Sequence, residues 1–130
     1  MTIEWRYTVR EELGVLSLAG FLGAEAVDRF AGAVGWALAR GTGPVILDLT
    51  SLRGWSVGGR LAVARAARRL AAEGRRLELA AIPADGSHPA VLVHPDLPTA
   101  LAAHGVPAGG QREWRSDEWP GTGPAERPRA

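Results

Sequence analysis

The first forty residues alternate apolar and polar positions in a way that predicts two strands and a helix. Residues 2–9, TIEWRYTV, place an apolar side chain at every second position, which is the period of a half-buried strand. Residues 15–19, VLSLA, predict a second strand, and the short link REELG favours a hairpin. Residues 24–40 then carry apolar side chains at helical spacing, and Gly41 ends the pattern.

The middle of the chain alternates strand and helix patterns. Residues 45–49, VILDL, form a short apolar run that is typical of a buried central strand. Residues 59–73 have one apolar face and predict a helix, which Gly74 terminates. Residues 75–81, RRLELAA, predict the next strand. A strand, helix and strand in this order imply a parallel pair joined by a right-handed crossover.

The last third of the chain has weaker patterns. Residues 83–95 predict a loop, because prolines and a glycine interrupt them, with a short edge strand at 91–93. Asp96 is a suitable cap for a short helix that extends to His104. Residues 111–115, QREWR, predict a final strand.

Length and composition indicate one domain of the α/β class. The chain has 130 residues, of which 46% are hydrophobic, enough for a packed core. We expect the domain to span residues 1–119. Residues 120–130 contain too few apolar side chains to pack, so we expect a disordered tail.

Charge and composition exclude several classes of function. The net charge is +1, which implies no long-range attraction to nucleic acid. The charged N-terminal sequence has no signal-peptide core, and no apolar run is long enough to span a bilayer. The chain has no Cys, which fits a reducing compartment. We therefore expect a cytoplasmic protein that neither binds nucleic acid nor inserts into a membrane.

Three stretches of this sequence resemble the STAS domain, the fold of bacterial anti-sigma factor antagonists. VLSLAGFLG, residues 15–23, resembles the family's second strand, which ends in Gly-Glu-Leu-Asp. VILDLTSLRGWSVGG, residues 45–59, resembles its strand and phosphorylation loop, Asp-Ser-x-Gly. The helix from Gly59 to Gly74, followed by RRLELA, has the family's helix length and following strand, and LAAHGV also resembles a later helix end. The resemblance covers about residues 5–116 and implies a STAS-like mixed β-sheet with a parallel core and helices packed against it.

The resemblance also implies a binding function, with one departure. In the family, a loop Ser is phosphorylated by a partner kinase that is itself an anti-sigma factor, and the unphosphorylated antagonist sequesters that kinase. Alignment on Gly59 puts Val57 at the acceptor Ser. Ser56 then stands at the motif's Asp, Gly58 at its variable residue, and Gly23 at the early acidic residue. Both polar parts of the switch are absent.

The predicted partner surface is the loop 54–59 together with the helix at 59–73. The residues assigned to it are Trp55, Ser56, Val57, Gly58, Arg60 and Arg65. Ser56 is either a helix cap, which we favour, or a shifted phosphosite, since a helix start stabilises phosphate. Trp55 is either a core residue, which we favour, or an exposed anchor for the partner.

The densest charge cluster of the sequence is formed by arginines. Its members are Arg60, Arg65, Arg68, Arg69, Arg75 and Arg76. The cluster is either a surface for an acidic partner or, slightly favoured, a solvated helix face with Glu73 and Glu78 as counterions. Nucleic-acid binding is disfavoured because no aromatic side chains are interleaved with the arginines.

Candidate chemistry elsewhere in the sequence is sparse. His88, His94 and His104 lack the spacing of metal ligands, so we expect them on loops or at the surface. Asp48 follows an apolar strand with no paired acid or nucleophile, so we expect it to bond loop amides. The glycine-rich loop lacks the Lys and Ser or Thr of a phosphate-binding loop. We therefore expect no enzyme activity, no metal and no cofactor.

Together, these patterns predict a non-enzymatic STAS-like interaction domain. It would regulate an anti-sigma factor, a kinase-like protein or a related signalling complex without a phosphorylation switch. One alternative is a small-molecule or nucleotide sensor that uses the loop amides and residues 83–95. Another is a scaffold subunit of a larger enzyme or transporter complex. A homodimer is left open by the sequence.

Overall fold

The computed structural model describes residues 2–83, 91–106 and 111–115 of the chain. Its elements, in chain order, are β1 (Ile3–Arg10), β2 (Leu13–Leu22), the 3₁₀ turn η1 (Ala24–Ala26), α1 (Val27–Leu38), β3 (Val45–Trp55), α2 (Val57–Ala72), β4 (Leu77–Ala80), β5 (Val93–His94), α3 (Leu97–Ala103) and β6 (Gln111–Arg115).

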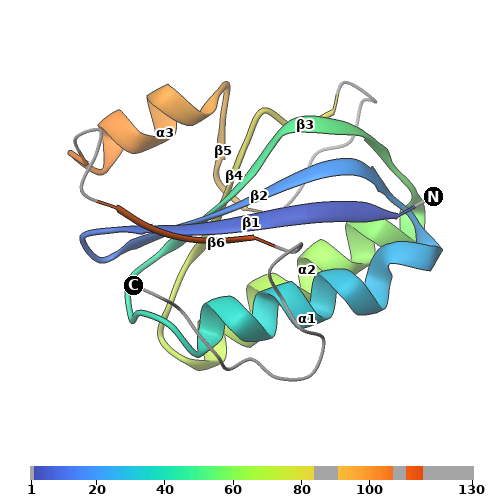
Figure 1. Ribbon diagram of the computed structural model, residues 1–130, viewed down its shortest axis with the longest axis horizontal. Coiled ribbons are helices and arrows are strands. Elements are labelled where there is room, and N and C mark those ends of the chain that lie inside the picture. Colours follow the sequence, from blue (N-terminus) through green and yellow to red (C-terminus); the bar gives the residue numbers. More distant parts are fainter. Residues whose placement is uncertain (1, 84–90, 107–110, 116–130) are drawn as a thin grey trace.

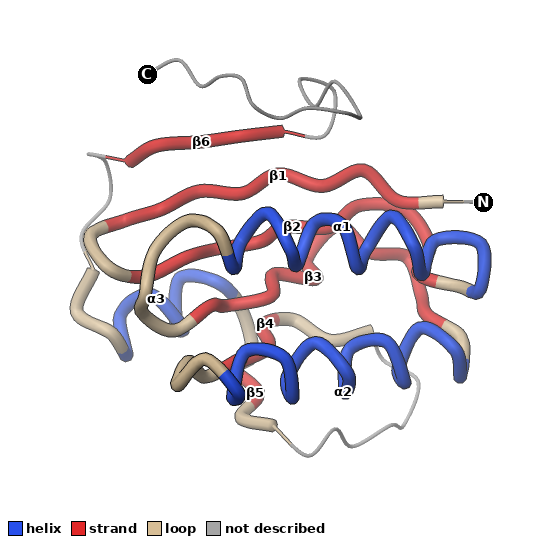
Figure 2. The backbone as a smooth tube through the Cα atoms, turned by 90° about the horizontal axis from the view of Figure 1, so that it is seen from below, coloured by secondary structure: helices blue, strands red, loops and turns tan. Residues whose placement is uncertain are grey.

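A mixed sheet with helices on both faces forms the body of the protein. Its strand order is β5-β4-β3-β2-β1-β6, with parallel pairs from β2 to β5 and antiparallel pairs on either side of β1. Helices α1 and α2 cover one face, and α3 lies on the other (Figure 1). Figure 2 shows α1 and α2 side by side. The predicted α/β sheet with a parallel core is confirmed.

The β1–β2 hairpin follows the predicted alternation. Ile3, Trp5 and Tyr7 are buried in the main core, while Glu4 and Arg6, on the other face of β1, are exposed. The main core lies between the sheet and the helices α1 and α2. Some of its largest buried side chains are Tyr7, Leu18, Phe30, Leu47 and Leu70.

Strand β3 is longer than residues 45–49, because it continues across an irregularity in its pairing with β2. The register shifts between Ser17 and Ala19 on β2. There the Asp48 carboxylate accepts hydrogen bonds from the Thr50 amide at 3.1 Å and the Thr50 hydroxyl at 2.6 Å. Ser17 Oγ donates to the same carboxylate at 3.3 Å. Asp48 therefore has a structural role as predicted, but the amide it binds is that of Thr50 in β3 and not a loop amide, and Asp48 lies within the strand and not at its end.

The opposite face of the sheet carries a smaller apolar cluster beneath α3. Its buried members are Leu13, Ile46, Ala80 and Ala100. Asp96 caps α3 as predicted, since its Oδ1 accepts a hydrogen bond from the Thr99 amide at 2.8 Å. The predicted edge strand is β5, and His104 is the C-cap of α3.

Several predictions fall on residues outside the described ranges. His88 and the tail at 120–130 lie there, so the domain limits and the disorder of the tail stay predictions. Within the described ranges, no helix has the length and hydrophobicity needed to cross a membrane.

Gly59 allows α2 to begin directly against the end of β2. A Cβ atom at this position would overlap the carbonyl oxygen of Leu22, so any larger residue must displace the backbone. The Ser56 amide donates to the same carbonyl at 3.0 Å. The backbones of β2 and α2 are therefore in direct contact at Leu22 and Gly59, and only glycine fits at this position of the helix.

We predict that Gly59→Ala lowers the free energy of unfolding by about 1–3 kcal/mol, because the added methyl group meets backbone that cannot easily yield. Gly58→Ala is the matched control, since a Cβ there would find Ser56 Oγ at 3.7 Å, an ordinary contact. Alanine also favours a helix over glycine, so this variant should keep or gain stability. Denaturant unfolding followed by circular dichroism measures both. Equal effects of the two substitutions would contradict the close approach.

Candidate functional site

The connection between β3 and α2 is Ser56 alone, which is shorter than the loop predicted at 54–59. Trp55 ends the strand and Val57 begins the helix. Ser56 has an extended backbone, and its Oγ accepts a hydrogen bond from the Gly59 amide at 3.1 Å. The favoured interpretation of Ser56 as a helix cap is confirmed, and a capping serine satisfies one of the free amides of the first turn.

Trp55 lies in the main core. Its side chain is 6% exposed and belongs to the cluster between the sheet and the helices. This is the alternative that the sequence favoured, and the ring is not available as an exposed anchor. Trp55 is therefore not part of an exposed contact surface.

One face of α2 presents apolar side chains to solvent. Val57 is 63% exposed and Leu61 is 53% exposed. Residues four apart lie on the same side of a helix, so the two side chains are neighbours, and the exposed Arg65 continues the row. We call Val57, Leu61 and Arg65 the α2 face. Among the described residues, Leu92 is the other large apolar side chain that is exposed.

The arginines do not form a single surface. Arg75 is 6% exposed, and its Nε donates to the Gly43 carbonyl at 2.6 Å. Its Nη1 donates to the Ala37 carbonyl at 3.1 Å, near the end of α1, where the Arg40 amide donates to the same oxygen. The predicted surface position of Arg75 is wrong, because this guanidinium, in the link between α2 and β4, binds the end of α1 and the loop that follows it.

The remaining arginines of the cluster have separate surroundings. Arg69 donates from Nη1 to the Ala31 carbonyl of α1 at 3.2 Å. Arg60 is half-buried, whereas Arg65 and Arg68 are exposed. Of the residues assigned to the partner surface, Val57 and Arg65 are thus exposed, and Ser56, Gly58 and Arg60 are half-buried.

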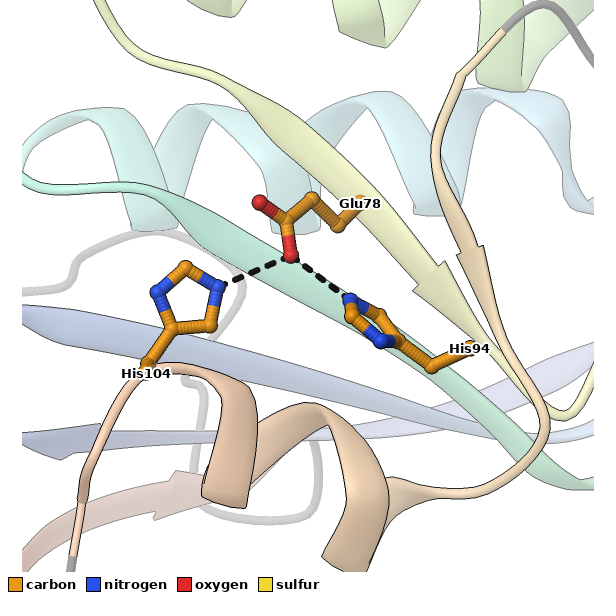
Figure 3. A group of neighbouring side chains, drawn as sticks. All are labelled: Glu78, His94 and His104. Carbon is orange, nitrogen blue, oxygen red and sulfur yellow. Dashed lines mark hydrogen bonds and ion pairs between the residues drawn. The ribbon is translucent and has the colours of Figure 1, made fainter.

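A second group of polar side chains meets on the face of the sheet that α3 covers. Glu78 of β4, His94 of β5 and His104 at the end of α3 point toward one another (Figure 3). Glu78 Oε1 lies 2.9 Å from His94 Nε2 and 2.8 Å from His104 Nε2. Glu78 Oε2 accepts a hydrogen bond from Arg76 Nε at 2.9 Å.

This group corrects two predictions. Glu78 is a counterion of one arginine of the cluster, Arg76, as expected, but it is fully buried on β4 and does not lie on a solvated helix face. His94 is buried and His104 is half-buried, whereas both were expected on loops or at the surface. The spacing along the sequence gave no signal of their meeting, since the three residues come from three separate elements. The signal that was available is the alternation of Leu77, Glu78 and Leu79, which places Glu78 on the opposite face of the sheet from the two leucines.

The surroundings of Glu78 favour its charged form. Burial raises the pKa of this carboxyl, but hydrogen bonds from His104, His94 and Arg76 outweigh burial and hold the pKa below its ordinary value of 4.5. A carboxyl whose pKa is lower in the folded state than in the unfolded state stabilises the fold at pH values above its unfolded-state pKa. That stability is lost as the pH falls through the folded pKa.

We therefore predict that Glu78→Gln flattens the acid side of the stability profile. The wild-type protein should lose stability more steeply than this variant as the pH falls below about 5, because only the wild type takes up a proton at this site on unfolding. Denaturant unfolding at a series of pH values measures the difference. Glu73→Gln removes an exposed carboxyl and is the control, which should follow the wild type. Identical slopes for Glu78→Gln and wild type would contradict the prediction.

Comparison with known proteins identifies the family. The family model described as "Mlab, STAS domain" matches residues 5–94, which run from β1 to β5. The chain therefore belongs to the STAS domain family, and the resemblance inferred from the sequence is confirmed. Such membership fits an interaction or regulatory domain.

The other comparisons add little. The comparison with curated proteins found no match. A solved structure described as "Crystal Structure Analysis of Mglu" is 26% identical and aligns with a TM-score of 0.49 over 65% of this chain. The aligned region is 20% of that structure's chain, so this chain spans about a fifth of its length.

Proposed function

We propose that this chain is a non-enzymatic STAS interaction domain that binds a partner protein through the α2 face. The partner is an anti-sigma factor, a kinase-like protein or a related cytoplasmic signalling complex. The observation that supports the proposal is the pair of exposed apolar side chains, Val57 and Leu61, at the start of α2. The family resemblance assigns the phosphorylation loop, where the kinase acts, to this part of the chain.

The side chains of the α2 face indicate what kind of partner surface would fit them. Burying an exposed Val or Leu fully is worth about 1.5–3 kcal/mol, so the remaining exposed area of Val57 and Leu61 supplies a fraction of that. The matching surface is an apolar hollow. Arg65 lies one turn further along α2, so an acidic side chain at the rim of that hollow would increase the rate of association.

The proposed binding is not controlled by phosphorylation of this loop. Val57 stands where the family has its acceptor Ser, and its side chain has no atom that accepts phosphate. The neighbouring Ser56 uses its Oγ to cap α2, and attachment of a phosphate would require that oxygen to be presented to a kinase. We therefore propose that the domain is constitutively competent to bind.

This leads to a prediction about the protein in its native host. Intact-mass spectrometry of the purified chain should show no phosphorylated species, including under conditions that activate kinases. Ser56→Ala should leave the mass distribution unchanged apart from the substitution itself. A stoichiometric phosphate mapped to Ser56 would mean that the switch has moved by one residue and still operates.

A photo-crosslinking amino acid placed at position 61 tests the proposed surface directly. In the native host it should capture one defined partner, which mass spectrometry identifies. The same amino acid at position 92 is the control, because Leu92 is also exposed and apolar but lies beside β5. Capture of a second copy of this chain would identify a homodimer. Equal capture from both positions, or none from position 61, would contradict the proposal.

Val57→Asp should abolish this capture while the domain stays folded. Asp at the first position of a helix is favourable, and Val57 is 63% exposed, so the folding cost should be about 0.5 kcal/mol or less. An unpaired carboxylate buried in the interface should weaken binding by about 2–5 kcal/mol. Calorimetric unfolding and binding to the captured partner measure the two effects. Leu92→Asp is the matched control, and an undiminished affinity of Val57→Asp would remove the α2 face as the site.

A further inference from the structure

We propose that Glu78, His94 and His104 form a binding site for a divalent transition-metal ion of the Zn²⁺ type. The three side chains offer one ligand atom each, Oε1 and two Nε2 atoms, and these atoms lie within 4.8 Å of one another. The site lies on the α3 face of the sheet, opposite α1 and α2, so it is independent of the proposed partner surface.

The three ligand atoms are close enough together for modest side-chain movements to bring them around one ion. Tetrahedral zinc holds His nitrogen and carboxylate oxygen at about 2.0–2.2 Å, which places neighbouring ligand atoms about 3.3 Å apart. Glu78 Oε1 lies 2.9 and 2.8 Å from the two imidazole nitrogens. An ion therefore needs these two separations to widen by a few tenths of an ångström. The two imidazole nitrogens, up to 4.8 Å apart, must move closer together by as much as about 1.5 Å, and each Nε2 must release the proton that it donates to Glu78.

The donor set selects the class of ion. Two imidazoles and one carboxylate suit zinc and its neighbours in the first transition row, whereas calcium and magnesium prefer oxygen ligands throughout. Three protein ligands leave a fourth coordination position. The side chains of His94 and His104 are 10% and 18% exposed, so a water molecule or an ion can reach them from solvent.

A second interaction orients the carboxylate. Arg76 Nε donates to Glu78 Oε2 at 2.9 Å, which leaves Oε1 directed at the two histidines. Such outer hydrogen bonds hold ligands in position at metal sites. The guanidinium of Arg76 is 68% exposed, so water screens its repulsion of a cation. An anionic fourth ligand would reduce the remaining positive charge.

The position of the site gives the ion a structural consequence. Helix α3 has 7 residues, of which Ala100 is buried and Leu97 and Leu101 are half-buried against the sheet, so it is a short element with a modest apolar contact. The ion would join the end of α3 to β4 and β5 through His104. Binding to the folded state alone would also raise the stability of the whole domain.

Zinc binding by the full chain, stripped of metal with a chelator, tests the site. Titration calorimetry with zinc chloride should show one ion bound per chain, and cobalt(II) should give the visible absorption of a tetrahedral complex. His94→Gln and His104→Gln should each weaken zinc affinity about tenfold or more, since each removes a ligand and keeps a polar side chain. Glu73→Gln, an exposed carboxyl, should bind zinc as the wild type does.

Long-range proton–nitrogen NMR of the wild-type imidazoles keeps the test independent of the folding of the variants. Zinc should shift the Nε2 signals of His94 and His104 together, at one equivalent. No zinc uptake by the wild type, shifts confined to His88, or unchanged affinity in both folded His variants would each overturn the proposal. The three side chains would then be a hydrogen-bonded network and no more.

Discussion

The contact between the first turn of α2 and the last residue of β2 determines which side of α2 faces the sheet and which side faces solvent. The Leu22 carbonyl accepts the Ser56 amide at 3.0 Å, and Gly59 lies so close to it that a side chain has no room. This contact sets the rotation of α2 about its axis. With that rotation, Ala62, Val63 and Ala66 face the sheet, and the α2 face points to solvent.

The two faces of the sheet differ in how their buried space is filled. On the side of α1 and α2, large apolar side chains fill the space, and a buried guanidinium, Arg75, satisfies carbonyls at its edge. On the side of α3, the apolar cluster is small, and the fully buried Glu78 is placed among three donors. A buried carboxylate is tolerable only with such partners, because an unpaired charge in the interior is costly. The end of α3 is therefore held both by this apolar cluster and by the hydrogen bond from His104 to Glu78.

The features that were predicted correctly are those that depend on residues close together in the sequence. The alternation of residues 2–9 and the apolar run at 45–49 gave their strands, and Asp96 gave the start of α3. The extension of β3 was not predictable, since it depends on pairing with β2. The burial of Arg75 and the meeting of Glu78 with two histidines were missed for the same reason. Each arises from contacts between elements far apart in the sequence. A prediction from the sequence has only the polarity of these residues to use, and polarity places them at the surface.

The identity of residue 57 is not explained by folding. The first turn of a helix favours Asp, Glu, Ser or Thr, and valine is a modest helix former. Val57 contributes little to the core, since 63% of it is exposed. A single exposed apolar side chain is ordinary on a protein surface, but Leu61 repeats the pattern one turn later on the same side. Folding alone would favour polar side chains at both positions, and this is the physical reason for proposing that the α2 face binds a partner.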